Sequence, residues 1–336
     1  MDHQQWSLRV GASVILCALV LRLGLGGFFQ PLADFLAKPN IASFLIYLET
    51  GRVVRFSTSL EEQEVFALES PVPDFAADAT IPAELPAFSA QDAAEVEVKN
   101  NSSAKPDLEQ LVERPLSWDL TGTEPTVLIL HTHATERYTR SIGEDYQESS
   151  AFRTLDEDYN MISVGDYLTQ MLEAGGLTVL HDRELHDYPS YNGSYSHARK
   201  SIGAYLEEYP SIQLVLDLHR DASGDNTNQM KTAAAVDGES SAQIMLVVGT
   251  DSSGLSHPNW EQNLALALKL HVQMERFAPG ICRYVNLRSQ RFNQDLSTGA
   301  LIVEIGAAGN THDEALKATE VLAKGILSLA KGTSVS

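Results

Sequence analysis

Short apolar runs alternating with amphipathic stretches fill the chain from residue 126 onward, and they constrain its fold more than any other feature. The runs are too short for helices and apolar on both faces, which is typical of strands buried in a parallel sheet. Strands separated by helical stretches predict an α/β fold, a doubly wound and mostly parallel sheet flanked by helices, in one domain at 123–332. The predicted strands cover residues 126–130, 177–180, 211–219, 243–249 and 300–306.

Helix-start signatures support this pattern. Asn160 precedes an apolar stripe that ends at Gly175-Gly176, as expected for a capped helix. Asn259 with Gln262, and Thr311 with Glu314, resemble capping boxes at the starts of two further helices. We therefore predict helices beginning near residues 160, 260 and 312.

An apolar run covers residues 10–29 and is interrupted only by Arg22. Twenty residues of helix span a bilayer, so we interpret this segment as a transmembrane anchor. A cleaved signal peptide is the alternative, although no A-x-A-type site follows the run. Arg9 on the N-terminal flank places residues 1–9 in the cytoplasm. We expect a single-pass protein of the cell membrane with its large domain outside the cytoplasm.

Two segments separate this run from the α/β pattern. Apolar residues at 41–48 suggest a short juxtamembrane helical segment within residues 30–60. Residues 61–122 are rich in Glu, Asp, Ala, Pro and Ser. Low hydrophobicity and an acidic excess do not favour a packed core, so the sequence predicts a flexible acidic linker here.

Charge and cysteine content exclude several functional classes. The formal net charge is -21, which argues against nucleic acid as a partner, because a nucleic-acid binder needs a basic surface. The two cysteines, Cys17 and Cys282, supply neither a disulfide framework nor a paired-cysteine metal site. A metal ion in the large domain would therefore rely on His, Asp or Glu.

Such residues gather where three predicted strands end. His131, Thr132, His133 and Glu136 follow the first strand, and the strand at 211–219 ends in Asp217, His219, Arg220 and Asp221. The spacing of two histidines at i and i+2 does not decide by itself which of them binds a metal, and only one is expected to be a ligand. An ion-pair network at Asp217–Asp221 is the alternative to a metal site. Glu304 lies within an apolar strand, and burial there would raise its pKa towards that of a general base.

The residues resemble a known family. The strings that carry the resemblance are HTHATERY (131–138), HDYPSYNGSY (186–195), DLHRDA (217–222), HPNWEQN (257–263), FNQDLS (292–297), VEIGAAGNTHDEA (303–315) and, more weakly, YLETGR (47–52). They are similar to those of the stage II sporulation protein P family. The resemblance implies a membrane-anchored N-acetylmuramoyl-L-alanine amidase with cross-link endopeptidase activity, distantly related to zinc amidases of the amidase 3 type.

The resemblance also implies roles for individual residues. It makes His131 and His219 ligands of Zn²⁺ and Glu304 the catalytic glutamate. Amidase 3 enzymes place a glutamate where this chain has Asn160, which leaves Glu136 as the predicted third ligand, with Glu157, Asp158 and His133 as alternatives. Predicted substrate-binding residues are Arg220, Asp221, His186 and Tyr191.

The implied biology is septal wall remodelling and engulfment during sporulation, at the septal or forespore-engulfing membrane. The substrate would be peptidoglycan, and the partners would be the stage II sporulation proteins D and M. No G-x-S-x-G motif favours a serine nucleophile. A different zinc peptidase acting on stem peptides and a non-catalytic wall-binding module remain alternatives.

Overall fold

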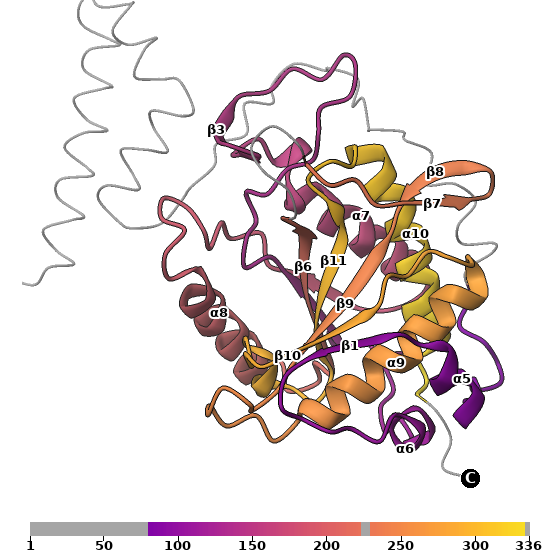
Figure 1. The fold of residues 1–336 in the computed structure, drawn as a ribbon. Helices are drawn as coiled ribbons and strands as arrows, with labels where there is room; N and C mark the ends of the chain where they lie inside the picture. Colours follow the sequence, from indigo (N-terminus) through magenta and orange to yellow (C-terminus); the bar gives the residue numbers. More distant parts are fainter. Residues whose placement is uncertain (1–79, 223–228, 333–336) are drawn as a thin grey trace, which may run out of the picture. The chain divides into compact units, whose positions relative to one another are not determined.

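The computed structural model describes residues 80–222 and 229–332 (Figure 1). The predicted cytoplasmic segment 1–9, anchor 10–29, juxtamembrane segment 30–60 and the linker up to residue 79 lie outside them. In the described part of the chain, no helix combines the length and apolar character that crossing a membrane requires.

The central feature is a seven-stranded sheet with the order β1-β10-β9-β11-β6-β2-β5. Its strands are β1 (Val98–Asn101), β2 (Val127–Leu130), β5 (Val179–His181), β6 (Leu214–Asp221), β9 (Ile244–Gly249), β10 (Val285–Arg288) and β11 (Ala300–Ala307). Two hairpins stand apart, β3 (Glu148–Ser150) with β4 (Arg153–Thr154) and β7 (Ala233–Val236) with β8 (Glu239–Ala242). The helices are α5 (Ala90–Glu95), α6 (Leu108–Glu113), α7 (Met161–Ala174), α8 (Ser194–Glu208), α9 (Trp260–Phe277) and α10 (His312–Ser328), with short turns η1 (Glu157–Tyr159) and η2 (Gln294–Leu296).

The sheet is mainly parallel, as predicted, but it contains one antiparallel junction. Within this seven-stranded sheet, neighbouring strands are parallel except β11 and β9, which pair Ile305 with Ile244. The start of β9 therefore lies beside the end of β11. One edge of the sheet consequently holds both the ends of β2, β6 and β11 and the starts of β9 and β10.

Helices cover the two faces unequally (Figure 1). Helices α7, α9 and α10 pack on one face, where the odd-numbered Ile129 and Val303 and the even-numbered Leu218 join the main core. Helix α8 covers the other face, against Leu128, Leu130 and Val215. Because side chains alternate along a strand, the position of each strand-end residue decides which face it reaches.

The segment before β2 differs from the predicted linker. Residues 80–122 include α5, β1 and α6, and β1 pairs with β10 through Val98 and Val285. Leu111 and Val112 of α6 are buried against α9. The flexible-linker prediction is therefore wrong for this part of 61–122. The few apolar residues of 80–122 are sufficient to order this segment because β10 at the sheet edge and α9 provide the surfaces against which they pack.

The predicted helix starts are observed, although not all of the predicted caps. Asn160 caps α7 by accepting from the Ile162 amide at 2.9 Å, and Thr311 with Glu314 forms a capping box at α10. Helix α9 does begin after Asn259, but that side chain donates to the Asp295 carbonyl and makes no capping bond. The predicted capping box at Asn259 is therefore wrong.

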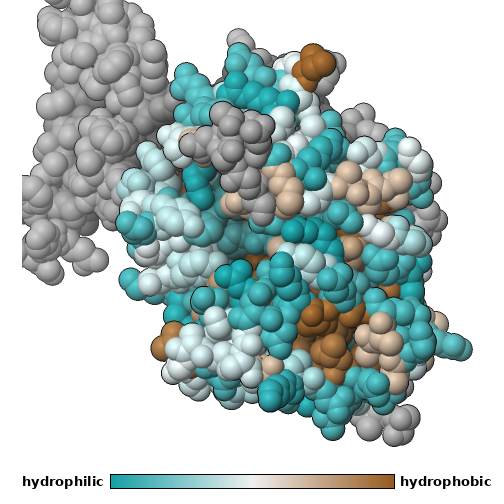
Figure 2. Space-filling model, viewed as in Figure 1, coloured by the Kyte–Doolittle hydropathy of each residue, from teal (hydrophilic) through white to brown (hydrophobic). Residues whose placement is uncertain are grey.

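The surface is largely hydrophilic on the face seen in Figure 2, with apolar side chains confined to small patches. Large exposed hydrophobic residues are Ile142, Leu155, Tyr188, Tyr191, Leu255 and Phe277 in the described residues. Two of these, Tyr188 and Tyr191, lie in the segment between β5 and α8. They therefore belong to the connection that borders the strand ends described next.

Candidate metal centre

The ends of β2, β6 and β11 bring four metal-competent or proton-accepting side chains onto the α8 side of the sheet. His219 and Glu304 are direct partners on the adjacent strands β6 and β11. His133 follows β2, and its ring lies perpendicular to that of His219 with 5.2 Å between centroids. Glu136 completes the group, with its Oε2 3.7 Å from His219 Nδ1.

His219 is held by a carboxylate behind it. Its Nε2 lies 2.9 Å from Asp217 Oδ1, without the direction of a hydrogen bond. Asp217 accepts from the backbone amide of Thr132 at 2.7 Å and from its hydroxyl at 2.6 Å. Burial alone would lower the pKa of His219, but Asp217 and Glu136 raise it well above its usual value. The Asp217 cluster thus ties the β2 loop to the β6 histidine.

Glu136 is buried between two arginines. Its Oε1 lies 3.5 Å from Arg220 Nη1 and 3.6 Å from Arg153 Nη2. Burial would raise the pKa of the carboxyl, but Arg220 and His219 hold it well below its usual range. Glu136 is therefore a fixed anion beside His219, which suits a ligand for a cation.

Glu304 is the partly exposed residue of an otherwise buried strand. Its Oε2 has no hydrogen-bond partner among the described residues. Burial raises the pKa of Glu304 to about 7, with Glu136 adding to the rise and His219 opposing it. A carboxyl with this environment can both accept and return a proton near neutrality.

His131 lies on the other face of the sheet, and this separates it from the group. It has the same parity as Ile129 and faces α7, where its Nε2 lies 2.8 Å from His181 Nε2 and its Nδ1 3.1 Å from the Leu218 carbonyl. A Cβ at Gly165 of α7 would come within 2.5 Å of His131 Nε2. The structure therefore does not bring the predicted trio of His131, Glu136 and His219 together.

His133, an alternative in the sequence analysis, takes the place expected of His131. Its ring stacks on Tyr191 with centroids 4.5 Å apart, and its Nδ1 is buried without a partner in the described part of the chain. Burial, followed by His219, lowers the pKa of His133 to about 4, so the imidazole is neutral at pH 7. Residues at i and i+2 of a strand share a face, so His131 and His133 are separated because β2 ends at Leu130 and the chain turns at residues 132–135.

The predicted substrate-binding residues are used in different ways. Arg220 is buried and donates to the carbonyls of Arg137 and Phe152, each at 3.0 Å, which leaves it a positioning role in the loop. Asp221 pairs with Arg283 at 2.7 Å. Both side chains therefore hold the protein together around the site.

The two residues from the β5–α8 connection also differ. His186 is buried, with its Nε2 3.1 Å from Asp182 Oδ2. Tyr191 is 55% exposed, and Arg153 lies 4.9 Å from its ring centroid. Tyr191 is thus the one of the four predicted substrate-binding residues that combines exposure with contact to His133.

The alternative ligands at the start of α7 have other surroundings. Glu157 pairs with Arg183 at 2.6 Å, Asp158 is exposed, and Asn160 uses its side chain to cap the helix. These residues belong to η1 and the α7 N-terminus rather than to the β2 loop that carries His133. Their geometry adds nothing to the group around His219.

The group around His219 has the donor set of a catalytic zinc site. Two imidazoles and a carboxylate leave a fourth position for water, and the buried His133 Nδ1 lacks a hydrogen-bond partner in the described residues. The ligand atoms are spaced more widely than in the tight clusters of the described chain, which all fall within 4.8 Å.

Comparison with known proteins settles the family. The model of the stage II sporulation protein P family matches residues 52–327. The chain belongs to this family. The match extends the resemblance seen in the sequence to the segment that contains α5, β1 and α6, and it includes each residue of the group around His219.

A curated relative supports the same assignment. Stage II sporulation protein P of Bacillus subtilis strain 168 is 29% identical over 214 residues, which is 60% of this chain. The aligned part is 50% of that protein, so the chain spans about half the length of the curated relative it matches.

Solved structures with similarity to the chain include several amidases. N-acetylmuramoyl-L-alanine amidase AmiC2 of Nostoc punctiforme is 13% identical, with a TM-score of 0.36 over 61% of this chain and 97% of that one. The catalytic domain of CwlV from Bacillus (Paenibacillus) polymyxa var. colistinus is 13% identical, with a TM-score of 0.36 over 60% of this chain and 96% of that one. The CwlD amidase of Clostridioides difficile, solved with the GerS lipoprotein, is 13% identical, with a TM-score of 0.33 over 61% and 95%.

Proposed function

We propose that this member of the stage II sporulation protein P family is a zinc-dependent peptidoglycan hydrolase that cleaves the amide between N-acetylmuramic acid and L-alanine. The observation that carries the proposal is the convergence of His133, Glu136, His219 and Glu304 at one sheet edge. A non-catalytic wall-binding module has no need of a partner-free buried carboxylate beside two histidines. The bond specificity rests on the family resemblance.

In this proposal His133, Glu136 and His219 hold Zn²⁺, and His131 is replaced as a ligand. Zinc bound there supplies a Lewis acid for a carbonyl oxygen and lowers the pKa of water from 15.7 to about 7. Asp217 orients His219, and Arg220 with Arg153 fixes the Glu136 carboxylate. Glu304, the neighbour of His219 on β11, would lie beside an ion held there.

Glu304 acts as the general base and then the general acid. Its Oε2, free of partners among the described residues, accepts a proton from the attacking water. It returns that proton to the nitrogen of L-alanine as the amide bond breaks. No other described carboxylate combines this position beside His219 with a pKa near 7.

Tyr191 would border the substrate cleft. It is exposed, stacks on His133 and lies beside Arg153. An exposed aromatic side chain suits contact with a sugar ring. The proposal therefore puts the glycan strand on the α8 side of the sheet, next to Tyr191.

The location and partners remain proposals of the same kind. We infer attachment to the cell membrane through residues 10–29, with the domain outside the cytoplasm during septal remodelling and engulfment. The stage II sporulation proteins D and M are proposed partners from the family resemblance. Protease protection of vesicles and co-purification with tagged partners would test the two inferences separately.

The test of the reaction is mass spectrometry of purified sacculi treated with the full-length chain. Release of whole stem peptides by the wild type, but not by His219→Ala or Glu304→Gln, supports the amidase. Peptides freed of cross-links but still attached to glycan would point to endopeptidase action, and single released residues to a carboxypeptidase. Sacculus binding without any product, in the presence of zinc, would reject the proposal in favour of a wall-binding module.

A further inference from the structure

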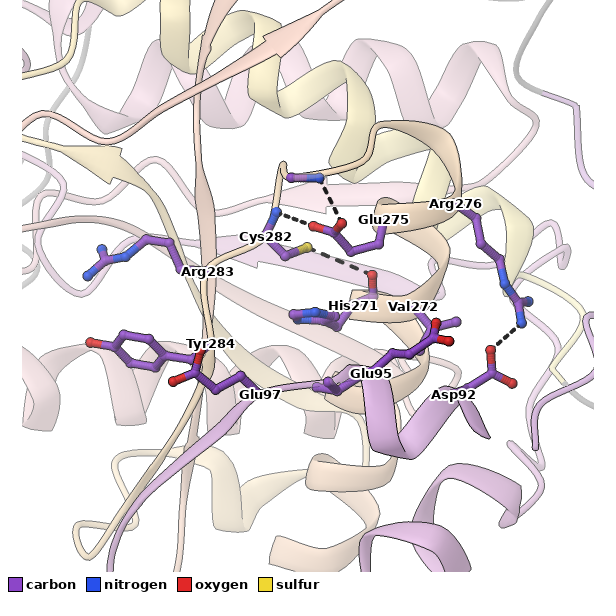
Figure 3. A pocket seen from close by; sticks show the side chains of 12 residues that line it. Asp92, Glu95, Glu97, His271, Val272, Glu275, Arg276, Cys282, Arg283 and Tyr284 are labelled. Atoms are coloured by element: carbon purple, nitrogen blue, oxygen red, sulfur yellow. Dashed lines mark hydrogen bonds and ion pairs between the residues drawn. The ribbon is translucent and has the colours of Figure 1, made fainter. Parts of the chain in front are cut away.

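A second metal-competent cluster lies in a cavity away from the residues assigned above. The cavity has a volume of about 640 Å³ and lies between α5, the C-terminal half of α9 and the start of β10 (Figure 3). His271, Glu275 and Cys282 contribute to its wall. The ligand atoms of these three residues all lie within 4.8 Å of one another.

The sequence places the three ligands with a helix and a tight turn. His271 and Glu275 are four residues apart on α9, so they share one face of the helix. The chain turns after α9 at Gly280, with φ of +85°, and Cys282 returns beside the helix. Cys282 is fixed there, because Arg283 donates to the Ile244 carbonyl at 2.7 Å and Ile244 donates to the Ile281 carbonyl at 2.8 Å.

Glu275 holds this turn in place. Its Oε1 accepts from the Cys282 amide at 2.7 Å and its Oε2 from the Gly280 amide at 2.8 Å. A carboxylate oxygen has a second lone pair, and ligating carboxylates are usually hydrogen-bonded in this way. A purely structural role as a turn lock explains Glu275 but leaves the other two side chains unexplained.

His271 and Cys282 point to a ligand. His271 is 7% exposed, its ring faces the cavity in Figure 3, and neither ring nitrogen has a hydrogen-bond partner in the described residues. The Cys282 thiol lies 3.8 Å from the His271 carbonyl and also lies beside the Glu275 carboxylate. An imidazole that has no protein partner and lies beside a thiol and a carboxylate is available to bind a ligand in the cavity.

We propose that His271, Glu275 and Cys282 form a second site for a divalent transition-metal ion of the zinc class. Ligands of tetrahedral zinc with bonds of about 2.0–2.3 Å lie about 3.3–3.8 Å apart, so the cluster needs only a small contraction. Thiolate and imidazole together select zinc over magnesium or calcium. Cys282 binds as the thiolate and releases its proton to solvent.

The bound ion would tie the end of α9 to the start of β10. Glu95 and Glu97, from the α5–β1 segment, also line the cavity (Figure 3). The neighbouring Arg283 pairs with Asp221 at the end of β6. The second site therefore stiffens the sheet edge that also carries His219.

Another tight cluster, Asp182, Glu184 and His186, does not carry the same inference. Asp182 Oδ1 accepts from the Glu184 amide at 3.0 Å, and its Oδ2 lies 3.1 Å from His186 Nε2. These bonds account for the cluster as a turn that holds His186.

The test uses cobalt as a probe in the full-length chain with Cys17→Ser. Cys282 is then the sole cysteine, so a sulfur-to-cobalt charge-transfer band can come from no other residue. We expect this band on titration with Co²⁺, its loss in Cys282→Ser and at least a tenfold weaker titration in His271→Gln. His257→Gln, which alters another buried histidine, is the matched control and should leave the band unchanged.

Metal content separates this site from the proposed catalytic one. Zinc-loaded wild type should hold two equivalents, and both Cys282→Ser and His219→Ala should lose one. If the catalytic proposal alone fails, the wild type holds one equivalent, which Cys282→Ser removes. Absence of the cobalt band, or a band unaffected by His271→Gln while circular dichroism shows a folded chain, would overturn the second site.

Discussion

Glu304 near the end of β11 and Glu314 at the start of α10 are only ten positions apart, but their surroundings have opposite effects on the carboxyl pKa. Glu314 at the start of α10 accepts from Ser240, Asn310 and the Thr311 amide and pairs with Lys231. These partners overcome the effect of burial and lower the pKa of Glu314 to about 2. In Glu304, one carboxylate oxygen has no partner in the described residues, and burial raises the pKa to about 7.

The histidines that follow β2 show the same contrast. His131 contacts His181 and the Leu218 carbonyl on the α7 side, whereas His133 has an unpartnered Nδ1 on the α8 side. A folded chain normally satisfies its buried polar groups, as it does at His131 and Glu314. The unpartnered His133 Nδ1 and Glu304 Oε2 both lie beside His219, which agrees with the catalytic role proposed for this edge of the sheet.

The largest effect is expected from His133→Ala or His219→Ala. Each removes a proposed zinc ligand, and loss of several kcal/mol of metal stabilisation corresponds to about 10³-fold or more in the rate of stem-peptide release. Zinc content measured by mass spectrometry should fall by one equivalent. If zinc stays bound in His133→Ala and the rate changes less than tenfold, His133 is not a ligand.

Glu304→Gln separates proton transfer from metal binding. We expect a rate about 10²–10⁴-fold lower with zinc content unchanged, because the amide cannot accept the proton of water. Turnover of muropeptides and metal content, measured on the same preparation, check this. Loss of zinc together with the rate would instead make Glu304 a ligand.

Glu314→Gln tests the satisfied carboxylate through stability. Since the pKa of Glu314 is lower in the folded chain than in the unfolded chain, its contribution is complete above about pH 4.5 and disappears as the pH falls towards 2. We expect the substitution to lower the free energy of unfolding by roughly 2–3 kcal/mol at pH 7, measured by urea denaturation. The difference in free energy of unfolding between the wild type and Glu314→Gln should shrink in acid. Glu113→Gln, at an exposed position, should neither lower the stability at pH 7 nor change its pH dependence. A gap that is the same at pH 3 and pH 7 would contradict the ionic explanation.

The smallest effect should come from His131→Ala. This substitution leaves His181 and the Leu218 carbonyl without their partner, which costs about 1–3 kcal/mol of stability. Zinc content should not change, and the rate should fall less than tenfold. If zinc is lost while circular dichroism shows an intact fold, His131 is a zinc ligand and its contrast with His133 does not hold.

The sequence was sufficient for the elements whose signal is local. The apolar strands at 211–219 and 300–306 and the capping box at Thr311 are present as predicted. The antiparallel junction was not predictable, because strand direction depends on how β9 and β11 meet in space. Strand β10 and the elements within 80–122 depend on pairing with distant segments, and acidic composition concealed the latter.

The sequence predicted which strand ends carry the candidate site. Glu136, His219 and Glu304 lie together, as their strand-end positions suggested. The choice between His131 and His133 needed the face on which α7 lies, because Gly165 lets that helix approach His131 closely. A contact between a strand-end loop and a distant helix has no signature in a local sequence pattern.

The edge position of β1 has a consequence for solubility. This strand is short and polar, with Lys99, Asn100 and Asn101 exposed, and it covers β10, whose first three residues are buried. Exposed polar edge strands with lysine resist the addition of strands from other copies. A truncated chain that begins at residue 121 would expose β10 as a bare apolar edge and is expected to aggregate, whereas one that begins at residue 80 keeps its natural barrier against sheet extension.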